Sequence, residues 1–272
     1  MRLTLNVRDE KTEQKAQKRT PEENIDFYSE MFSAKTLIEG QDGGVVTSML
    51  MWGLQRDLFD CAVVVQRREG YRAAAVVAEA VCDVLAAKGT KYLRVNTVSK
   101  LKDLVETGRR RIALVGTPCQ VHAARKIQST LLEKCPDLEL TLVGLFCFEA
   151  FNYEKLKGEV KKLLSVDLDA AEKTQIRKGK FTVWVDGKES SVSVKELNAA
   201  VEKGCSQCSD FTARYADVSV GSVGSDEGYS TVVVRTPEGR KLLENLDLTR
   251  GELRREEIVR LAAFKKRRAA NV

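Results

Sequence analysis

Short apolar strands that alternate with helical segments constrain the fold of this chain more than any other feature. Three runs rich in Val, Leu and Ile, at residues 60–66, 111–116 and 140–146, have the composition of buried strands. Apolar residues at helical spacing predict helices over 43–58, 73–88, 98–107 and 121–134, the last after a TPCQ turn. This alternation favours an α/β fold with a mixed, largely parallel sheet flanked by helices.

The second half of the chain has a different residue pattern. Residues 181–185 and 190–194 flank Asp186-Gly187 and predict a β-hairpin. A CxxC motif and two strands with glycine loops follow, and the tail from Thr249 predicts a basic helix whose charges are typical of a solvated face. We therefore expect a charged, exposed N-terminal arm (1–30), an N-terminal α/β region (31–150) and a C-terminal α+β region (151–272) that carries the CxxC motif.

Charge and composition exclude several classes of function. The net charge is +6, from 45 Lys and Arg against 39 Asp and Glu, and aromatic residues make up only 6% of the chain. A nucleic-acid surface needs a stronger basic excess and more stacking side chains, so we expect no nucleic-acid partner. No run of about 18 apolar residues predicts a transmembrane segment, and the N-terminus lacks the apolar stretch of a signal peptide. We expect a cytoplasmic protein.

The cysteines carry the strongest sign of chemistry. The chain has seven cysteines but a single histidine, His122, which argues against mixed Cys/His zinc sites and histidine-based catalysis. Cys119 and Cys147 each follow a predicted strand, and Cys205 and Cys208 form the CxxC motif. The carboxyl ends of parallel strands meet at one edge of a sheet, so both strand-end thiols can converge there with the CxxC pair. Four thiolates at one place suit an iron–sulfur cluster or an all-cysteine zinc site.

Two alternatives for these cysteines stay open at this point. Cys119 and Cys147 could be small buried apolar residues. The CxxC motif could be a thiol–disulfide pair, although its late position before a strand disfavours thioredoxin-like chemistry. We assign no function to the remaining cysteines or to the histidine: Cys61, Cys82, Cys135 and His122.

Glycine-rich loops and nearby lysines are a weaker signal. Gly43 and Gly44 precede a helix, where free backbone amides can bind a phosphate, and residues 221–225 form a second loop open to close approach. Neither loop is the GxGxxG fingerprint of dinucleotide-binding folds. Lys91-Tyr92 and residues 178–180 add cations and an aromatic face. Each pattern alone is equally typical of an ordinary turn or a solvated surface.

Taken in order, these motifs resemble those of the coenzyme F420 hydrogenase/dehydrogenase beta-subunit family. The resemblance runs through DGGVVTSML, GTKY, TPCQ, GLFCFEAF, IRKGKF and KGCSQCSDFTARYADVSVGSVGS and covers residues 35–235. Longer family members add a ferredoxin-like CxxCxxCxxxC segment, which this sequence lacks, as it lacks the paired CxxC motifs that hold nickel in a hydrogenase large subunit. The chain therefore resembles an electron-accepting subunit, similar to the beta subunit of F420-reducing hydrogenase.

The resemblance implies one [4Fe–4S] cluster, one FAD and coenzyme F420 as substrate. It assigns the cluster to Cys119, Cys147, Cys205 and Cys208. It implies flavin contacts from the matched loops: Gly43, Gly44, Thr47, Lys91, Tyr92, Thr117, Gln120, Lys178, Lys180, Ser222 and Gly224. Such a subunit passes electrons through the cluster to FAD and on as hydride to F420, and no catalytic side chain is required.

The resemblance also implies partners, the hydrogenase large and small subunits or those of another dehydrogenase, in a hetero-oligomeric complex. Two alternatives remain. The same cofactors could serve a formate dehydrogenase- or ferredoxin-linked complex, or an acceptor other than F420. The four cysteines could instead hold zinc in a structural or assembly subunit.

Overall fold

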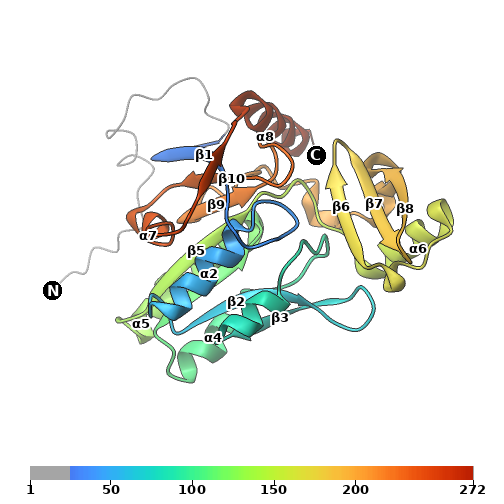
Figure 1. Cartoon of the computed structure of the whole chain (residues 1–272). Coiled ribbons are helices and arrows are strands. Elements are labelled where there is room, and N and C mark those ends of the chain that lie inside the picture. Colours follow the sequence, from blue (N-terminus) through green and yellow to red (C-terminus); the bar gives the residue numbers. More distant parts are fainter. Residues whose placement is uncertain (1–24, 272) are drawn as a thin grey trace.

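The computed structural model describes residues 25–271 of the chain (Figure 1). Within these residues the strands form one sheet of eight strands and a second sheet of three. From edge to edge, the large sheet contains β11 (Thr249–Gly251), β1 (Glu30–Lys35), β10 (Ser230–Val234), β9 (Val218–Gly221), β5 (Glu139–Leu145), β4 (Arg111–Gly116), β2 (Cys61–Arg67) and β3 (Ala73–Ala78). The small sheet contains β6 (Lys173–Arg177), β7 (Lys180–Val185) and β8 (Lys188–Ser193), so the predicted hairpin is confirmed. The α/β class with a mixed sheet is confirmed as well.

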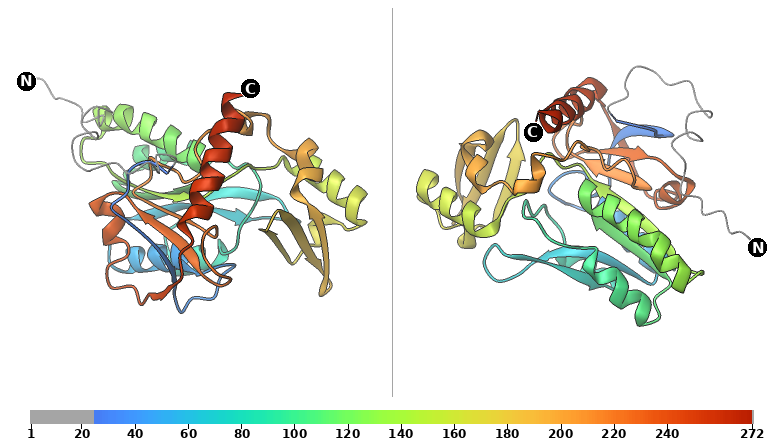
Figure 2. Two further views of the ribbon diagram at one scale, coloured as in Figure 1. Left: turned by 90° about the horizontal axis from the view of Figure 1, so that it is seen from above. Right: turned by 180° about the vertical axis from the view of Figure 1, so that it is seen from behind.

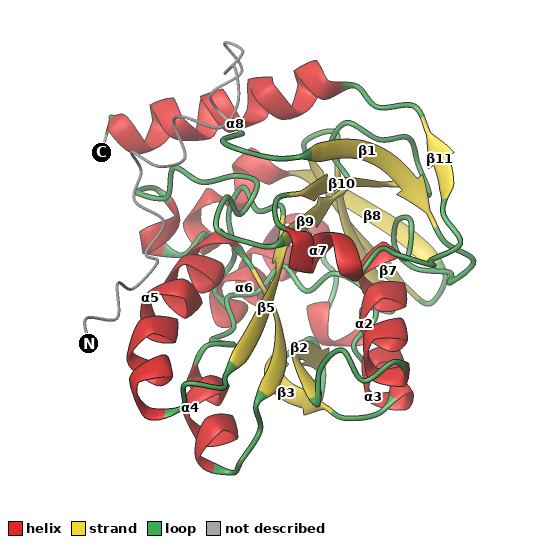
Figure 3. Ribbon diagram, turned by 90° about the vertical axis from the view of Figure 1, so that its left-hand side faces the viewer, coloured by secondary structure: helices red, strands yellow, loops and turns green. Residues whose placement is uncertain are grey.

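Helices cover both faces of the large sheet and give the fold three layers. One face carries α2 (Val45–Gln55), α3 (Val81–Ala86) and α7 (Pro237–Lys241), and the other carries α4 (Ser99–Glu106) and α5 (Pro118–Lys134) (Figures 2 and 3). Outside these layers lie α6 (Tyr153–Leu164), α8 (Arg255–Ala270) and short 3₁₀ turns at Leu168–Ala170, Val194–Ala200 and Lys203–Cys205. No helix within residues 25–271 combines the length and the apolar character needed to cross a lipid bilayer.

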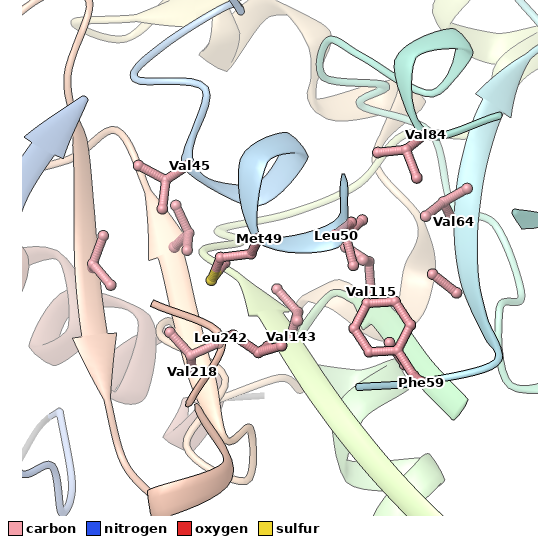
Figure 4. Close-up of a cluster of buried hydrophobic side chains, with 14 of the residues drawn as sticks. Val45, Met49, Leu50, Phe59, Val64, Val84, Val115, Val143, Val218 and Leu242 are labelled. Atoms are coloured by element: carbon pink, nitrogen blue, oxygen red, sulfur yellow. The ribbon is translucent and has the colours of Figure 1, made fainter. Parts of the chain in front are cut away.

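The core follows from the two-residue period of the strands. Val143 of β5 lies in a cluster with Met49 and Leu50 of α2 (Figure 4), whereas its neighbour Leu142 lies in the cluster formed with α4 and α5. A strand with both faces covered needs apolar residues at successive positions. The central strands are therefore continuous apolar runs in the sequence.

The directions of the strands create one special edge. Among the described strands, β2 with β4, β4 with β5 and β5 with β9 are parallel, and the remaining neighbours in the large sheet are antiparallel. Two successive antiparallel pairings leave β1 pointing the same way as β9. The carboxyl ends of β1, β2, β4, β5 and β9 therefore lie along one edge of the sheet. Figure 1 shows the small sheet next to this edge.

Two predictions of secondary structure are corrected. The tail predicted as a helix from Thr249 begins with strand β11, and its helix α8 starts only at Arg255. The Ala-rich segment 73–88 is not a single helix but strand β3 followed by α3. Ala75 pairs with Val65 and Val77 with Val63 in an antiparallel ladder with β2. This pairing outweighs the intrinsic helix propensity of alanine.

The predicted regions can be compared with the sheets. Residues 1–24 of the predicted arm lie outside the described residues, whereas Ile25 is fully buried and β1 starts at Glu30. The large sheet takes strands from both sides of residue 150, and the small sheet lies within 151–272. The division into regions 31–150 and 151–272 stays a prediction.

Candidate functional site

The loops at the carboxyl edge bring most of the predicted site residues together. They are the segments that follow β1, β2, β4, β5 and β9. Cys119 is the second residue of α5, directly after β4, and Cys147 follows β5 by two residues. The glycine pair 43–44 lies in the loop between β1 and α2, and Ser222 follows β9. This edge is where ligands bind in many open α/β sheets.

The CxxC segment is attached to the same edge by hydrogen bonds. The amide of Ala150 donates to the sulfur of Cys205, with N and Sγ 3.4 Å apart, and the amide of Cys147 donates to the carbonyl of Phe211 at 3.0 Å. Cys119 is exposed, and Cys147, Cys205 and Cys208 are partly buried. The fold thus places a strand-end cysteine and the CxxC pair on two adjoining segments.

The four thiols interact electrostatically. Burial raises the pKa of Cys147 to about 12, and the charges of Cys205, Cys119 and Cys208 add to this effect while Lys265 opposes it. Burial also raises the pKa of Cys205, with contributions of the same sign from Cys119 and Cys208. We call these four predicted cysteines, Cys119, Cys147, Cys205 and Cys208, the cysteine group.

The donor set of the cysteine group fits an iron–sulfur cluster. No three Cys, His, Asp or Glu side chains in residues 25–271 are gathered as the ligands of a single ion would be. A [4Fe–4S] core is larger than one ion and binds one thiolate at each of four irons, so its ligands need not meet at a point. The amide bonded to Cys205 is the kind of hydrogen bond that tunes such thiolates.

Hydrogen bonds around one predicted residue, Tyr92, connect loops of the large sheet to the small sheet. The hydroxyl oxygen of Tyr92 accepts hydrogen bonds from Gln41 Nε2 at 3.1 Å and from the amide of Ile176 in β6 at 2.8 Å. Gln41 also accepts a bond from the amide of Thr90 at 2.9 Å. Burial raises the pKa of Tyr92 to about 12, so this phenol keeps its proton at neutral pH. The loop before α2, the loop before Leu93 and β6 are thus tied together.

The glycines before α2 are required by the fold itself. A Cβ at Gly43 would stand 2.7 Å from the amide nitrogen of Ser230, and one at Gly44 would stand 2.8 Å from Thr36 Oγ1. Gly44 also has a left-handed φ of 69°. Neither a side-chain cap nor an acidic residue in the first turn neutralises the start of α2, where Thr47 lies. Its first backbone amides keep the capacity to bind an anion.

Other predicted flavin residues have defined protein contacts. Gln120 accepts a hydrogen bond from the amide of Thr97 at 3.0 Å, and the hydroxyl of Thr117 lies 3.3 Å from the sulfur of Cys119. Both residues therefore lie next to the cysteine group. Burial lowers the pKa of Lys91 to about 8, and its Nζ donates to three carbonyls at the end of α3.

The last predicted contacts differ in exposure. Lys178 and Lys180 are exposed at the turn between β6 and β7. The carbonyl of Ser222 accepts a hydrogen bond from Ser225. Gly224 is buried against Ile258 of α8, where a Cβ would come within 2.8 Å of Ile258 Cδ1. The structure thus gives Gly224 a packing role.

Several charged residues that contact the loops of this edge were not predicted from the sequence. Asp42 has its pKa raised by burial, against the charges of Arg177 and Lys173 on β6. Its position beside the glycine pair is a signal that could have identified it. Lys265 and Arg268 reach the cysteine loops from α8. Basic residues in a charged tail carry no sign in the sequence that they point inward.

The residues without an assigned function lie elsewhere in the structure. Cys61 and Cys135 are buried in the core under α4 and α5, and Cys82 is exposed on α3. His122 stacks on Tyr215, with ring centroids 4.6 Å apart.

Two neighbouring cavities open beside the start of α6, which follows the loop after β5. One, of about 270 Å³, is lined by Leu93, Phe151, Tyr153 and Glu202 among others. The second, of about 450 Å³, shares Tyr153 and Arg72 with it. The amide of Glu202 donates to the carbonyl of Ala150, whose own amide bonds Cys205. The first cavity therefore adjoins the cysteine group.

Comparison with known proteins identifies the class of protein to which this fold belongs. Two segments match the family described as coenzyme F420 hydrogenase/dehydrogenase, beta subunit: residues 31–102 match its N-terminal part, and residues 109–260 match its C-terminal part. The chain belongs to this coenzyme F420 hydrogenase/dehydrogenase beta-subunit family.

Individual relatives agree with this assignment. The chain is 38% identical over 213 residues to the coenzyme F420 hydrogenase subunit beta of Methanococcus voltae, covering 77% of this chain and 76% of the relative. It is 38% identical over 255 residues to a coenzyme F420-dependent sulfite reductase of Methanocaldococcus jannaschii. This match covers 89% of this chain but only 40% of the length of that relative. A chain in the structure of the F420-reducing [NiFe] hydrogenase complex from Methanosarcina barkeri superimposes with a TM-score of 0.85 at 28% identity, over 92% of each chain.

Proposed function

We propose that this chain is the flavin- and cluster-bearing subunit of an F420-dependent redox complex. Cys119, Cys147, Cys205 and Cys208 hold a [4Fe–4S] cluster, FAD binds at the same edge, and F420 is the substrate. The observation that supports the proposal is the attachment of the CxxC turn to the loop after β5, with Cys119 and Cys147 following the ends of two neighbouring parallel strands.

The residues of the chain supply binding and position. The uncapped start of α2 offers amides to the flavin phosphates, and Thr117 and Gln120 line the approach to Cys119. Tyr92 holds the loop before α2 against β6 by accepting hydrogen bonds from both. These two segments form the walls of the proposed site, and the bonds keep them in place. When bound, the flavin exchanges single electrons with the cluster and hydride with F420, so no side chain has to act as acid or base. The electrons come from hydrogenase large and small subunits or from another dehydrogenase.

Reconstitution of the purified chain tests this proposal. We expect the chain, loaded anaerobically with iron, sulfide and FAD, to contain four irons and one flavin and to absorb broadly at about 400 nm in addition to the flavin bands. With an artificial electron donor it should reduce F420. A colourless chain that binds zinc would support the structural alternative, and a brown flavoprotein that leaves F420 oxidised would support another acceptor.

A cysteine variant tests the ligand assignment. Cys205→Ala should lose the iron and the electron transfer while FAD stays bound, because the flavin loops do not include the CxxC segment. Cys82→Ala is the matched control, since Cys82 is exposed on α3. Its iron content and F420 reduction should equal those of the wild type. Full iron content in Cys205→Ala would refute the assignment.

The reverse direction is a second candidate. It is favoured by the similarity to a relative named as a coenzyme F420-dependent sulfite reductase, over 89% of this chain. The same site would then oxidise reduced F420 and feed electrons to a partner. Rates measured in both directions with one artificial dye, on the same reconstituted chain, distinguish the two candidates.

A further inference from the structure

The terminal helix α8 turns part of its basic face toward the interior. Lys265 is only 1% exposed, although it lies in a segment whose charges predict a solvated face. An unpaired buried ammonium is costly, so its surroundings must offer negative charge or strong acceptors. The groups around Lys265 therefore indicate the role of this part of α8.

Both cysteine loops are bonded to α8. Lys265 Nζ donates to the carbonyl of Cys147 at 2.6 Å. Arg268 donates to the carbonyl of Cys205 at 3.0 Å and to that of Phe148 at 3.2 Å, and it forms an ion pair with Glu149 at 2.9 Å. Arg268 is thus a bridge between the loop after β5 and the CxxC turn.

Aromatic contacts hold this arrangement. The guanidinium of Arg268 lies 4.4 Å from the ring centroid of Phe148, and Phe148 stacks on Phe264 of α8 with centroids 5.7 Å apart. The turn of α8 from Phe264 to Arg268 is thereby fixed against the segment that carries Cys147. Lys265 places its ammonium against the backbone of Cys147, in the loop that also bonds Cys205 through the amide of Ala150.

We propose that Lys265 and Arg268 are positioning residues for the metal centre: Arg268 holds the two cysteine loops together, and the cation of Lys265 raises the reduction potential of the cluster. The inference rests on the proposed function, because it assumes a cluster on the cysteine group. A reduced cluster carries one more negative charge than the oxidised one, so a nearby cation stabilises the reduced state more. Both residues lie beyond residue 260, where the match to the family ends.

Potentiometric titration of the reconstituted chain, followed by its visible and electron paramagnetic resonance signals, tests the role of Lys265. Lys265→Met should keep the iron but lower the equilibrium constant for cluster reduction by up to about tenfold, which is about 59 mV for a one-electron couple. Lys265→Arg should keep the wild-type potential because it keeps the charge. Arg267→Met is the matched control, since it removes a cation from an exposed position of α8, and it should change little.

An unchanged potential in an iron-loaded Lys265→Met chain would overturn the electrostatic role. If that variant fails to hold iron, Lys265→Gln retains a hydrogen-bond donor without the charge and should show the same negative shift. A wild-type potential in Lys265→Gln would overturn the role equally. A wild-type chain that takes up no iron would instead remove the proposed function, so the two failures can be told apart.

The bridging role of Arg268 has its own test. Arg268→Met should hold less than half of the wild-type iron per chain, while its FAD content and its helical circular dichroism stay unchanged. Arg268→Lys keeps one cation and should recover part of the iron. Complete iron loading of Arg268→Met would show that the loops do not need this bridge.

Discussion

Asp169 shows how single residues set the stability of the region next to the site. Its carboxylate accepts hydrogen bonds from Tyr153, from the amide of Tyr71 and from Lys157. Burial acts to raise the pKa of Asp169, but these bonds outweigh it and lower the pKa from 3.8 to about 2. The carboxylate is therefore more stable in the folded chain than in the unfolded one.

This shift predicts an acid-dependent loss of stability. Because the folded pKa lies below the unfolded value, the contribution of Asp169 is complete above pH 4 and is lost as the pH falls toward 2. Asp169→Asn should lower the free energy of unfolding by about 2 kcal/mol at pH 7, with a difference from wild type that shrinks below pH 4. Denaturant unfolding at several pH values measures this. Asp186→Asn, at an exposed turn, is the control and should leave the free energy of unfolding within about 0.5 kcal/mol of the wild type.

Single residues also show what the sequence could reveal of the site. Cys119 and Cys147 could be predicted together because the end of a parallel strand fixes where the next residue lies. Lys265 could not, because a lysine in a basic tail gives no sign of burial until the neighbouring loops are known.

Among the elements, the link between the loop before α2 and β6 depends on one hydroxyl. Tyr92→Phe leaves the amide of Ile176 and the side chain of Gln41 without their acceptor. We expect it to lower the free energy of unfolding by about 1–3 kcal/mol and to weaken FAD binding, since both partners of the hydroxyl belong to the site walls. Calorimetry and flavin titration measure the two effects. Tyr229→Phe, whose ring contacts Lys35, is the control, and equal FAD affinity in both variants would contradict the prediction.

The elements differ in how well their sequences predict them. The three apolar runs correspond within one residue to β2, β4 and β5, because strands buried on both faces are strongly patterned. The alanines of β3 favour a helix locally, and only the pairing with β2 makes this segment a strand. β1 is not predicted because its neighbours β10 and β11 lie some two hundred residues further along the chain.

At the scale of the whole molecule, a bound cluster joins segments that are distant in sequence. It would cross-link α5, the loop after β5, the CxxC turn and, through Lys265, α8. A ligand that binds the folded chain alone stabilises it, so anaerobic removal of iron by a chelator should lower the melting temperature by several degrees. Differential scanning calorimetry of loaded and stripped chains measures this. The Cys205→Ala chain should melt like the stripped wild type and should not respond to the chelator.

The position of β1 in the large sheet has a consequence for synthesis. Met31 pairs with Val233, and Ala34 pairs with both Ser230 and Arg250. While the polypeptide is leaving the ribosome, β1 cannot form these described pairings until residues 230–251 have emerged. If the cysteine group holds a cluster, a centre loaded on the folded chain would form only after β10 and β11 have paired with β1.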